Sequence, residues 1–135
     1  MEINTVGLIT YHFPHLKTEQ ITEQLFNIMD CDYRMYALPF KQRKPRDVVF
    51  PHRPNQATGV APEMIAAKHN IPYIVCETDE DIDSQCDVYL ILGAGILSAQ
   101  CVAGKKIVNC HPGVIPASRG LDIFKWDILE QKPVG

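Results

Sequence analysis

Asn109 and His111 stand one residue apart at the end of a short apolar run, Lys106–Val108. If a strand continues from Lys106 to His111, side chains alternate between faces, so Asn109 and His111 point the same way. The carboxyl edge of a parallel sheet is where α/β proteins bind ligands. An asparagine amide donates through its NH2 group, and an imidazole can donate or accept. Together the two side chains are suited to polarising a carbonyl group.

The residues after His111 predict a stiff loop. Pro112 and Pro116 fix φ and lack a backbone donor, and Gly113 and Gly120 permit positive φ. From the residues alone, two interpretations stay open. The segment is either a catalytic strand tip or a strand-ending turn that happens to carry an asparagine and a histidine.

The longer motif resembles a known family. Residues 109–120 read Asn-Cys-His-Pro-Gly-Val-Ile-Pro-Ala-Ser-Arg-Gly, and residues 121–129 contain Trp126 in a helical pattern. This combination is similar to the signature of folate-dependent formyltransferases, which include methionyl-tRNA, glycinamide ribonucleotide and sugar-nucleotide formyltransferases. The similarity covers residues 109–129, and nearer the N-terminus only the order of elements agrees.

The resemblance implies a function and a set of residues. It implies transfer of a formyl group from N10-formyltetrahydrofolate to an amine, with a nucleotide-linked amino sugar favoured over methionyl-tRNA as acceptor. Asn109 and His111 would be catalytic, and the Ile115–Pro116 bond would be cis. The family's third catalytic residue, an aspartate, is expected beyond Gly135, so the chain resembles a formyltransferase domain that is incomplete at its C-terminus. The folate site would include Gly95, Ile96 and Leu97.

Other residues are candidate substrate contacts. His12, just after the first expected strand, and Arg119, within the motif, are the two predicted substrate-binding residues. The basic run from Lys41 to Arg53 could bind phosphates of a nucleotide sugar or a tRNA, or could be a solvated loop. The Gly93-Ala-Gly95 turn does not fit a dinucleotide site, because Ser98 occupies the third glycine position.

Hydrophobic periodicity predicts alternating strands and helices in a single domain, residues 1–135. This alternation predicts an α/β protein with a Rossmann-like, doubly wound and mainly parallel sheet. Thr18 is the predicted N-cap of the first helix. Strands are expected at residues 5–11, 33–38, 71–76, 87–92 and 106–111, and helices at 18–29, 62–69, 98–103 and 121–131.

Composition excludes several classes of protein. Hydrophobic residues make up 46% and charged residues 21%, and the net charge is -3, which gives no basic signature for nucleic acid. There is no apolar run long enough for a membrane span and no signal peptide, so a cytoplasmic location is expected. Five cysteines without a CxxC spacing predict neither a disulfide framework nor a metal site. Cys76 and Cys110 are expected to be buried.

Two further expectations concern activity and assembly. Without its aspartate, the chain could be a non-catalytic module that binds folate, a nucleotide or a partner protein. An uncovered edge strand and the apolar residues Leu121, Phe124 and Ile128 predict a homo-oligomer, or a marginally stable monomer, with contact near residues 106–131.

Overall fold

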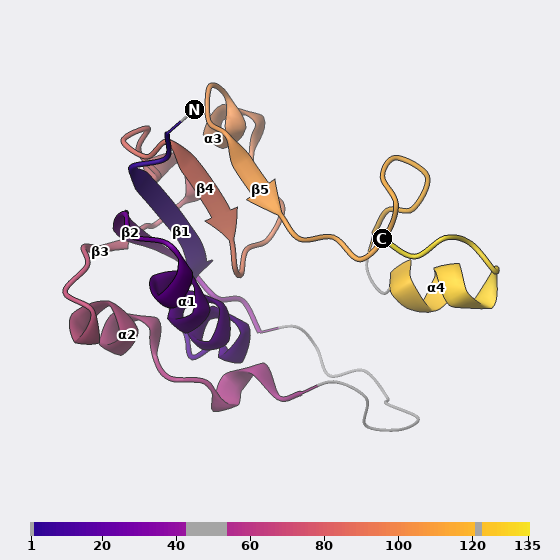
Figure 1. Cartoon of the computed structure of the whole chain (residues 1–135), viewed down its shortest axis with the longest axis horizontal. Coiled ribbons are helices and arrows are strands. Elements are labelled where there is room, and N and C mark those ends of the chain that lie inside the picture. Colours follow the sequence, from indigo (N-terminus) through magenta and orange to yellow (C-terminus); the bar gives the residue numbers. More distant parts are fainter. Residues whose placement is uncertain (1, 43–53, 121–122) are drawn as a thin grey trace.

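The chain folds around a five-stranded parallel sheet, as its sequence predicts. The computed structural model describes residues 2–42, 54–120 and 123–135 (Figure 1). The strand order is β3-β2-β1-β4-β5, and every neighbouring pair is parallel. The strands are β1 (Thr5–Tyr11), β2 (Asp32–Leu38), β3 (Tyr73–Val75), β4 (Val88–Ile91) and β5 (Ile107–Asn109).

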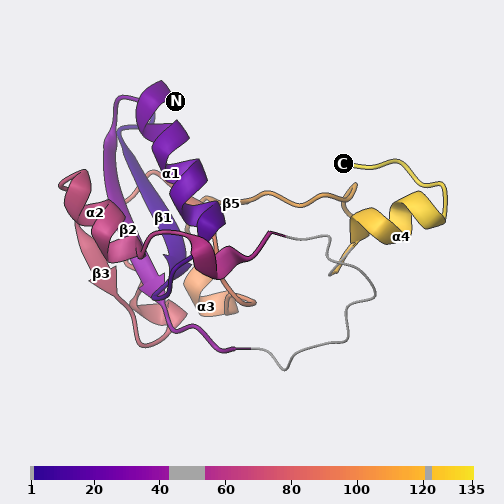
Figure 2. The same cartoon turned by 90° about the horizontal axis from the view of Figure 1, so that it is seen from below.

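Helices cover both faces of this sheet. Figure 2 shows α1 and α2 on one face and α3 on the other. The helices are α1 (Leu16–Ile28), α2 (Pro62–Lys68), α3 (Ala99–Val102) and α4 (Ile123–Leu129), with single 3-10 turns η1 (Gln56–Thr58) and η2 (Asp79–Asp81). Coverage of both faces explains why the central strands are nearly continuous apolar sequence.

Three strands are shorter than predicted: β4 loses one residue at each end, and the shortening of the third and fifth has an identifiable reason. The third begins at Tyr73 rather than Ile71, after Pro72, whose missing N–H cannot join a ladder. The fifth ends at Asn109 rather than His111. Its partner β4 ends opposite Asn109, at Ile91, so no strand residue remains to pair with His111.

The core lies on the two faces of the sheet. On the α1 and α2 face, Leu8 and Met35 are fully buried against Ile65 of α2. On the α3 face, Ile9, Tyr36 and Tyr89 are fully buried in a cluster that includes Cys101. These strands and the helices α1, α2 and α3 form one unit, here called the sheet body.

A close contact joins the two central strands. Gly7 of β1 is paired with Tyr89 of β4, and the Tyr89 ring lies over the glycine. A Cβ atom at position 7 would lie 2.4 Å from Cδ1 of that buried ring. Gly7 is therefore required by the space that Tyr89 occupies.

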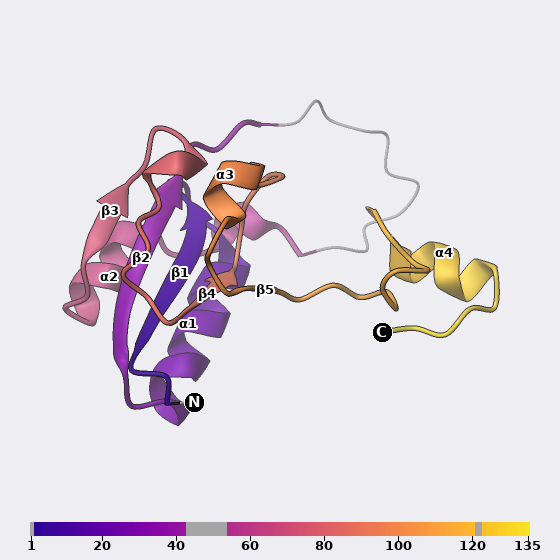
Figure 3. The same ribbon diagram turned by 90° about the horizontal axis from the view of Figure 1, so that it is seen from above.

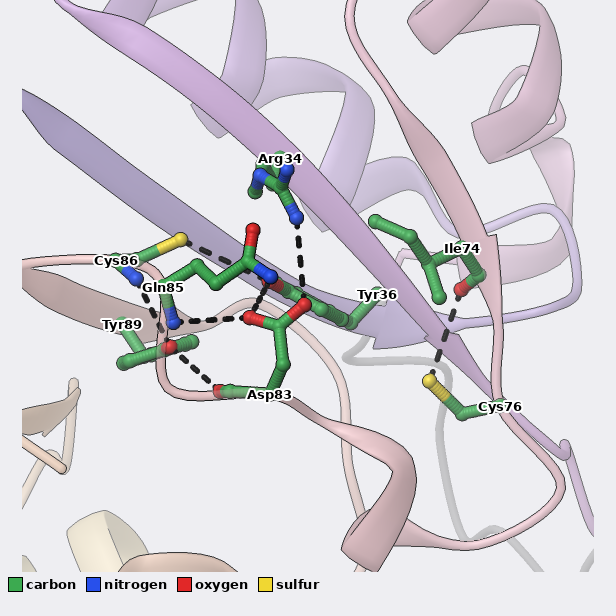
Figure 4. Close-up of polar contacts among 8 residues, drawn as sticks. All are labelled: Arg34, Tyr36, Ile74, Cys76, Asp83, Gln85, Cys86 and Tyr89. Atoms are coloured by element: carbon green, nitrogen blue, oxygen red, sulfur yellow. Dashed lines mark hydrogen bonds and ion pairs between the residues drawn. The ribbon is translucent and has the colours of Figure 1, made fainter. Parts of the chain in front are cut away.

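Polar groups fasten the loop between η2 and β4 to the α3 face (Figure 4). The carboxylate of Asp83 accepts hydrogen bonds from the Tyr36 hydroxyl at 2.6 Å and from Nη1 of Arg34 at 3.3 Å. The Tyr89 hydroxyl donates to the Asp83 carbonyl at 2.6 Å. Burial raises the pKa of the Tyr36 hydroxyl and of the Cys86 thiol beside it. Because these groups stay protonated near neutral pH, the cluster fastens the loop and supplies no nucleophile.

The start of α1 differs from the prediction. The N-cap is His15 rather than Thr18, and the helix begins at Leu16. The amide of Lys17 donates instead to the Gln56 side chain at 2.9 Å. Thr18 is fully buried, and its hydroxyl lies 2.6 Å from that of Thr10. A hydrogen-bond acceptor at Thr18 was predicted from local sequence, but the side-chain oxygen of Gln56 in η1 accepts from the helix end instead.

The chain after β5 leaves the sheet. Figures 1 and 3 show an extended stretch that carries α4 away from the sheet body; residues 110–135 are here called the C-terminal segment. The segment folds on itself through an antiparallel bridge between Gly113 and Val134. The Ile115–Pro116 bond is cis, as predicted.

The expectations about which side chains are buried have different outcomes. Cys76 is buried as predicted, but Cys110 is exposed, because it follows the end of β5 rather than lying within a covered strand. Phe124 and Ile128 are uncovered, as predicted, whereas Leu121 lies outside the described residues. Most of the predicted basic loop, residues 43–53, also lies outside them.

Candidate functional site at the carboxyl edge of the sheet

Three strands bring their carboxyl ends together. Ile9 of β1 is in register with Ile91 of β4, which is in register with Asn109 of β5. Strands lie about 4.8 Å apart, so the ends of β1 and β5 are roughly 10 Å from each other. The strand order reverses between β1 and β4, and ligands of doubly wound sheets bind at such a point.

Asn109 is exposed at the tip of β5. Because paired residues of parallel strands point to the same face, Asn109 lies on the side of Ile91 and Ile107. That is the face covered by α3 and by Leu97. The Asn109 carboxamide and the turn that precedes α3 therefore share one face of the sheet.

The predicted folate residues form that turn. Gly95 has open space around its Cα, Ile96 is fully exposed and Leu97 packs on the core. The following amide of Ser98 donates to Oδ2 of Asp79 at 2.5 Å, and the Ser98 hydroxyl accepts from the Cys101 amide at 3.1 Å. The turn is thus anchored at its end and open at Gly95 and Ile96.

His15, which follows β1, lies at the point where the strand order reverses. A Cβ atom on Gly93, just after β4, would lie 3.0 Å from Cε1 of His15 and 2.8 Å from the Tyr11 ring. Nδ1 of His15 lies 2.8 Å from the Thr18 hydroxyl. Burial, and then the positive charge of Lys17, lowers the pKa of His15. The His15 imidazole is therefore held beside Gly93, at the carboxyl edge of the sheet.

His12 faces the other way. Its Nδ1 lies 2.7 Å from the hydroxyl of Tyr73 on β3, at the far side of β2 from the reversal point. Burial, followed by the nearby charge of Glu63, raises the pKa of Tyr73 to about 12, so the phenol keeps its proton. A small cavity of about 170 Å³ lies beside this pair. The His12 side chain is thus directed toward β3, away from β5, which carries Asn109.

His111 belongs to the C-terminal segment rather than to β5. Its Nε2 lies 3.1 Å from the carbonyl oxygen of Ser118. A carbonyl oxygen can only accept, so Nε2 carries the hydrogen, and in the neutral ring Nδ1 is left as the acceptor. The structure therefore defines the tautomer of His111 but does not place its ring on the strand that carries Asn109.

Ser118 and Asp127 form a buried pair behind His111. Ser118 is 2% and Asp127 1% exposed, and the Ser118 hydroxyl donates to Oδ1 of Asp127 at 2.7 Å. Sequence reasoning set Asp127 aside because it matches no family motif. The one feature of the sequence that could have indicated burial of Asp127 is its position between the apolar residues Trp126 and Ile128. Arg119, the other predicted substrate contact, is exposed on the same segment.

Within the described residues, a second cleft lies far from these groups. A hollow of about 620 Å³ lies at the amino-terminal edge of the sheet, lined by residues that include Asp32, Arg34 and His69. None of the residues that line this hollow is a predicted site residue. In the same part of the chain, no three potential metal ligands come together, and no helix combines the length and the apolar character that crossing a membrane requires.

No protein-family model matches the sequence, and no curated protein matches it.

Proposed function

We propose that the chain is an N-formyltransferase, or part of one, that moves a formyl group from N10-formyltetrahydrofolate to an amine. The observation that carries the proposal is the motif from Asn109 to Gly120, whose first residue is exposed at the carboxyl edge of the sheet. The favoured acceptor is the amino group of a nucleotide-linked sugar.

The arrangement at this edge supports a folate site beside Asn109. The turn of Gly95 and Ile96 is open and lies on the same face as the carboxamide. An open glycine allows a planar ring to approach the backbone closely. The pterin would lie against this turn, which would bring the formyl group toward the tip of β5.

The reaction needs few groups from the protein. The amine nitrogen attacks the formyl carbon and forms a C–N bond, while the formyl oxygen becomes an oxyanion. The Asn109 NH2 group would donate to that oxygen, a contact typically worth about 3–4 kcal/mol in acyl chemistry. Nδ1 of His111 would take the proton released by the amine. The oxyanion then collapses to a carbonyl as the bond to N10 breaks, and N10 receives the proton that His111 took from the amine.

The assignment predicts that Asn109→Ala and His111→Asn each lower the rate of transfer by about 10²–10³-fold, because each removes a group used in the transition state. Formyl transfer would be measured with dTDP-, UDP- and GDP-linked amino sugars and with methionyl-tRNA, using both this chain and a version extended beyond Gly135. Asn27→Ala, which changes an exposed residue near the end of α1, is the matched control. Failure of both forms to bind folate would reject the proposal.

A binding module without turnover is the alternative. It is favoured by the position of His111, which lies in the C-terminal segment and not beside Asn109 on β5. Calorimetric titration with folate and nucleotides distinguishes the two functions. Binding without transfer in either form supports the module, and measurable turnover excludes it.

A further inference from the structure

We propose that Ser118 and Asp127 are positioning residues that hold the His111 imidazole in one tautomer and one orientation. The inference rests on the proposed function for its catalytic meaning, but the contacts themselves do not depend on it. They run from Oδ1 of Asp127 to the Ser118 hydroxyl, and from the Ser118 carbonyl to Nε2 of His111.

The pair fixes the position of the Ser118 carbonyl. The Ser118 amide donates to the carbonyl of Val114 at 2.8 Å, while its hydroxyl is held by Asp127 at 2.7 Å. Gly113 adds a steric limit, because a Cβ there would lie 2.8 Å from Cβ of Ser118. With its amide, its hydroxyl and one flank constrained, Ser118 presents its carbonyl to His111 in a single direction.

The orientation of α4 leaves most of its large apolar side chains exposed. Asp127 is the buried residue of this helix, whereas Phe124, Trp126 and Ile128 are each about half exposed or more, at 48%, 54% and 56%. Ile123, one turn before Asp127, is partly buried beside Gly113. The side of the helix that is packed thus carries the carboxylate and Ile123, and its other large apolar side chains are left to solvent.

Stability alone does not account for this carboxylate. Oδ2 of Asp127 is buried and has no hydrogen-bond partner within residues 2–42, 54–120 and 123–135. A buried polar oxygen without a partner costs free energy, and an apolar replacement of a buried polar pair is often neutral or stabilising. We therefore interpret the buried pair of Ser118 and Asp127 as serving to position another group rather than to stabilise the fold.

That group is the His111 ring. With Nε2 donating to a fixed carbonyl, Nδ1 is the nitrogen left to accept a proton. When Nδ1 accepts a proton, the Nε2 hydrogen bond becomes charge-assisted and strengthens. A fixed Ser118 carbonyl thus keeps Nδ1 as the nitrogen available to the amine in the proposed reaction.

Nitrogen-15 NMR of the histidine rings tests the proposal directly. The His111 signals are assigned from their loss in His111→Asn. In the parent chain we expect the pattern of an Nε2–H tautomer. Ser118→Ala and Asp127→Ala should shift both ring nitrogens toward averaged values, whereas Asp127→Asn keeps an Oδ1 acceptor and should retain the parent pattern. Glu130→Gln, on the exposed part of the same segment, is the control.

The double variant Ser118→Ala with Asp127→Leu separates positioning from folding. It leaves no unpaired buried group, so the chain should melt no lower than the parent, and the His111 signals should still shift. Unchanged His111 signals in both Ser118→Ala and the double variant would overturn the proposal. Amide signals of the sheet body report whether each variant is folded.

Kinetics adds a second readout. Ser118→Ala should lower kcat about tenfold, a fraction of what general acid–base catalysis contributes, while KM for the folate stays within about twofold. Equal loss in Asp127→Asn would contradict positioning through Oδ1. If the parent chain transfers no formyl group, the proposed function fails, and the NMR result alone still decides whether the pair positions His111.

Discussion

The sheet body buries mainly apolar side chains, whereas the C-terminal segment buries polar ones. In the body, leucine, isoleucine, methionine and tyrosine fill both faces of the sheet. In the described part of the C-terminal segment, the buried side chains are those of Ser118 and Asp127, and large apolar residues are exposed. The body can therefore be stable by itself, because hydrophobic burial dominates folding. The segment depends on a few directional hydrogen bonds.

A matched pair of leucines tests this difference most strongly. Leu8 is 0% and Leu129 72% exposed. Leu8→Ala should lower the free energy of unfolding by about 2–5 kcal/mol, because it opens a cavity in a packed core. Leu129→Ala should change it by less than about 0.5 kcal/mol. Urea denaturation followed by circular dichroism measures both, and similar losses would mean that α4 packs through its apolar side in solution.

Association is the next largest expected effect. β5 is an edge strand, with Val108 about half exposed, and α4 presents Phe124 and Trp126 to solvent. Uncovered edges and apolar patches promote self-association. Phe124→Glu with Trp126→Ala should weaken a dimer at least about tenfold, which corresponds to roughly 1.4 kcal/mol.

Sedimentation over a range of concentrations provides the measurement. Ile28→Ala removes an exposed apolar residue of α1, on the sheet body, and serves as the control. A monodisperse parent chain that melts at about 45–65 °C, as mesophilic domains do, would contradict the expectation and would leave the apolar side of α4 without a role in assembly.

The smallest expected effect concerns pH and His15. Its pKa is lowered in the folded chain, mainly by burial, so the unfolded chain binds a proton more readily. The native state should therefore lose stability as pH falls from about 6.5, the ordinary value for histidine, through the lowered folded value. Above that range, the contribution is fully present. His15→Gln should flatten this part of the profile of unfolding free energy against pH.

Much of the sheet could be predicted from sequence, because buried parallel strands read as apolar runs between helical patterns. The ends of β3 and β5 could not, since they depend on Pro72 and on where the neighbouring strand stops. The hydrogen bond between Thr10 and Thr18 could not be predicted from sequence, for another reason. Local sequence favoured a capping role for Thr18, and tertiary packing placed it in the interior.

The candidate site was predicted only in part. Asn109 and the turn at Gly95 lie at the expected edge, because both follow strands that the apolar pattern locates. His111 does not share the strand with Asn109, since strand alternation stops where β5 stops. Asp127 was invisible to pattern analysis, because charged residues are rarely fully buried and an acid in a short helix is expected to face solvent.

The contact between Gly7 and Tyr89 also limits which substitutions these two positions can accept during evolution. A first change at position 7 would place a methyl group 2.4 Å from a ring that cannot move aside. A first change of Tyr89 to a smaller residue would instead open a void above a glycine. Either single step is harmful, whereas a chain that carries both changes could be sound. The two positions should therefore evolve as a compensating pair, and related sequences should exchange side-chain volume between them.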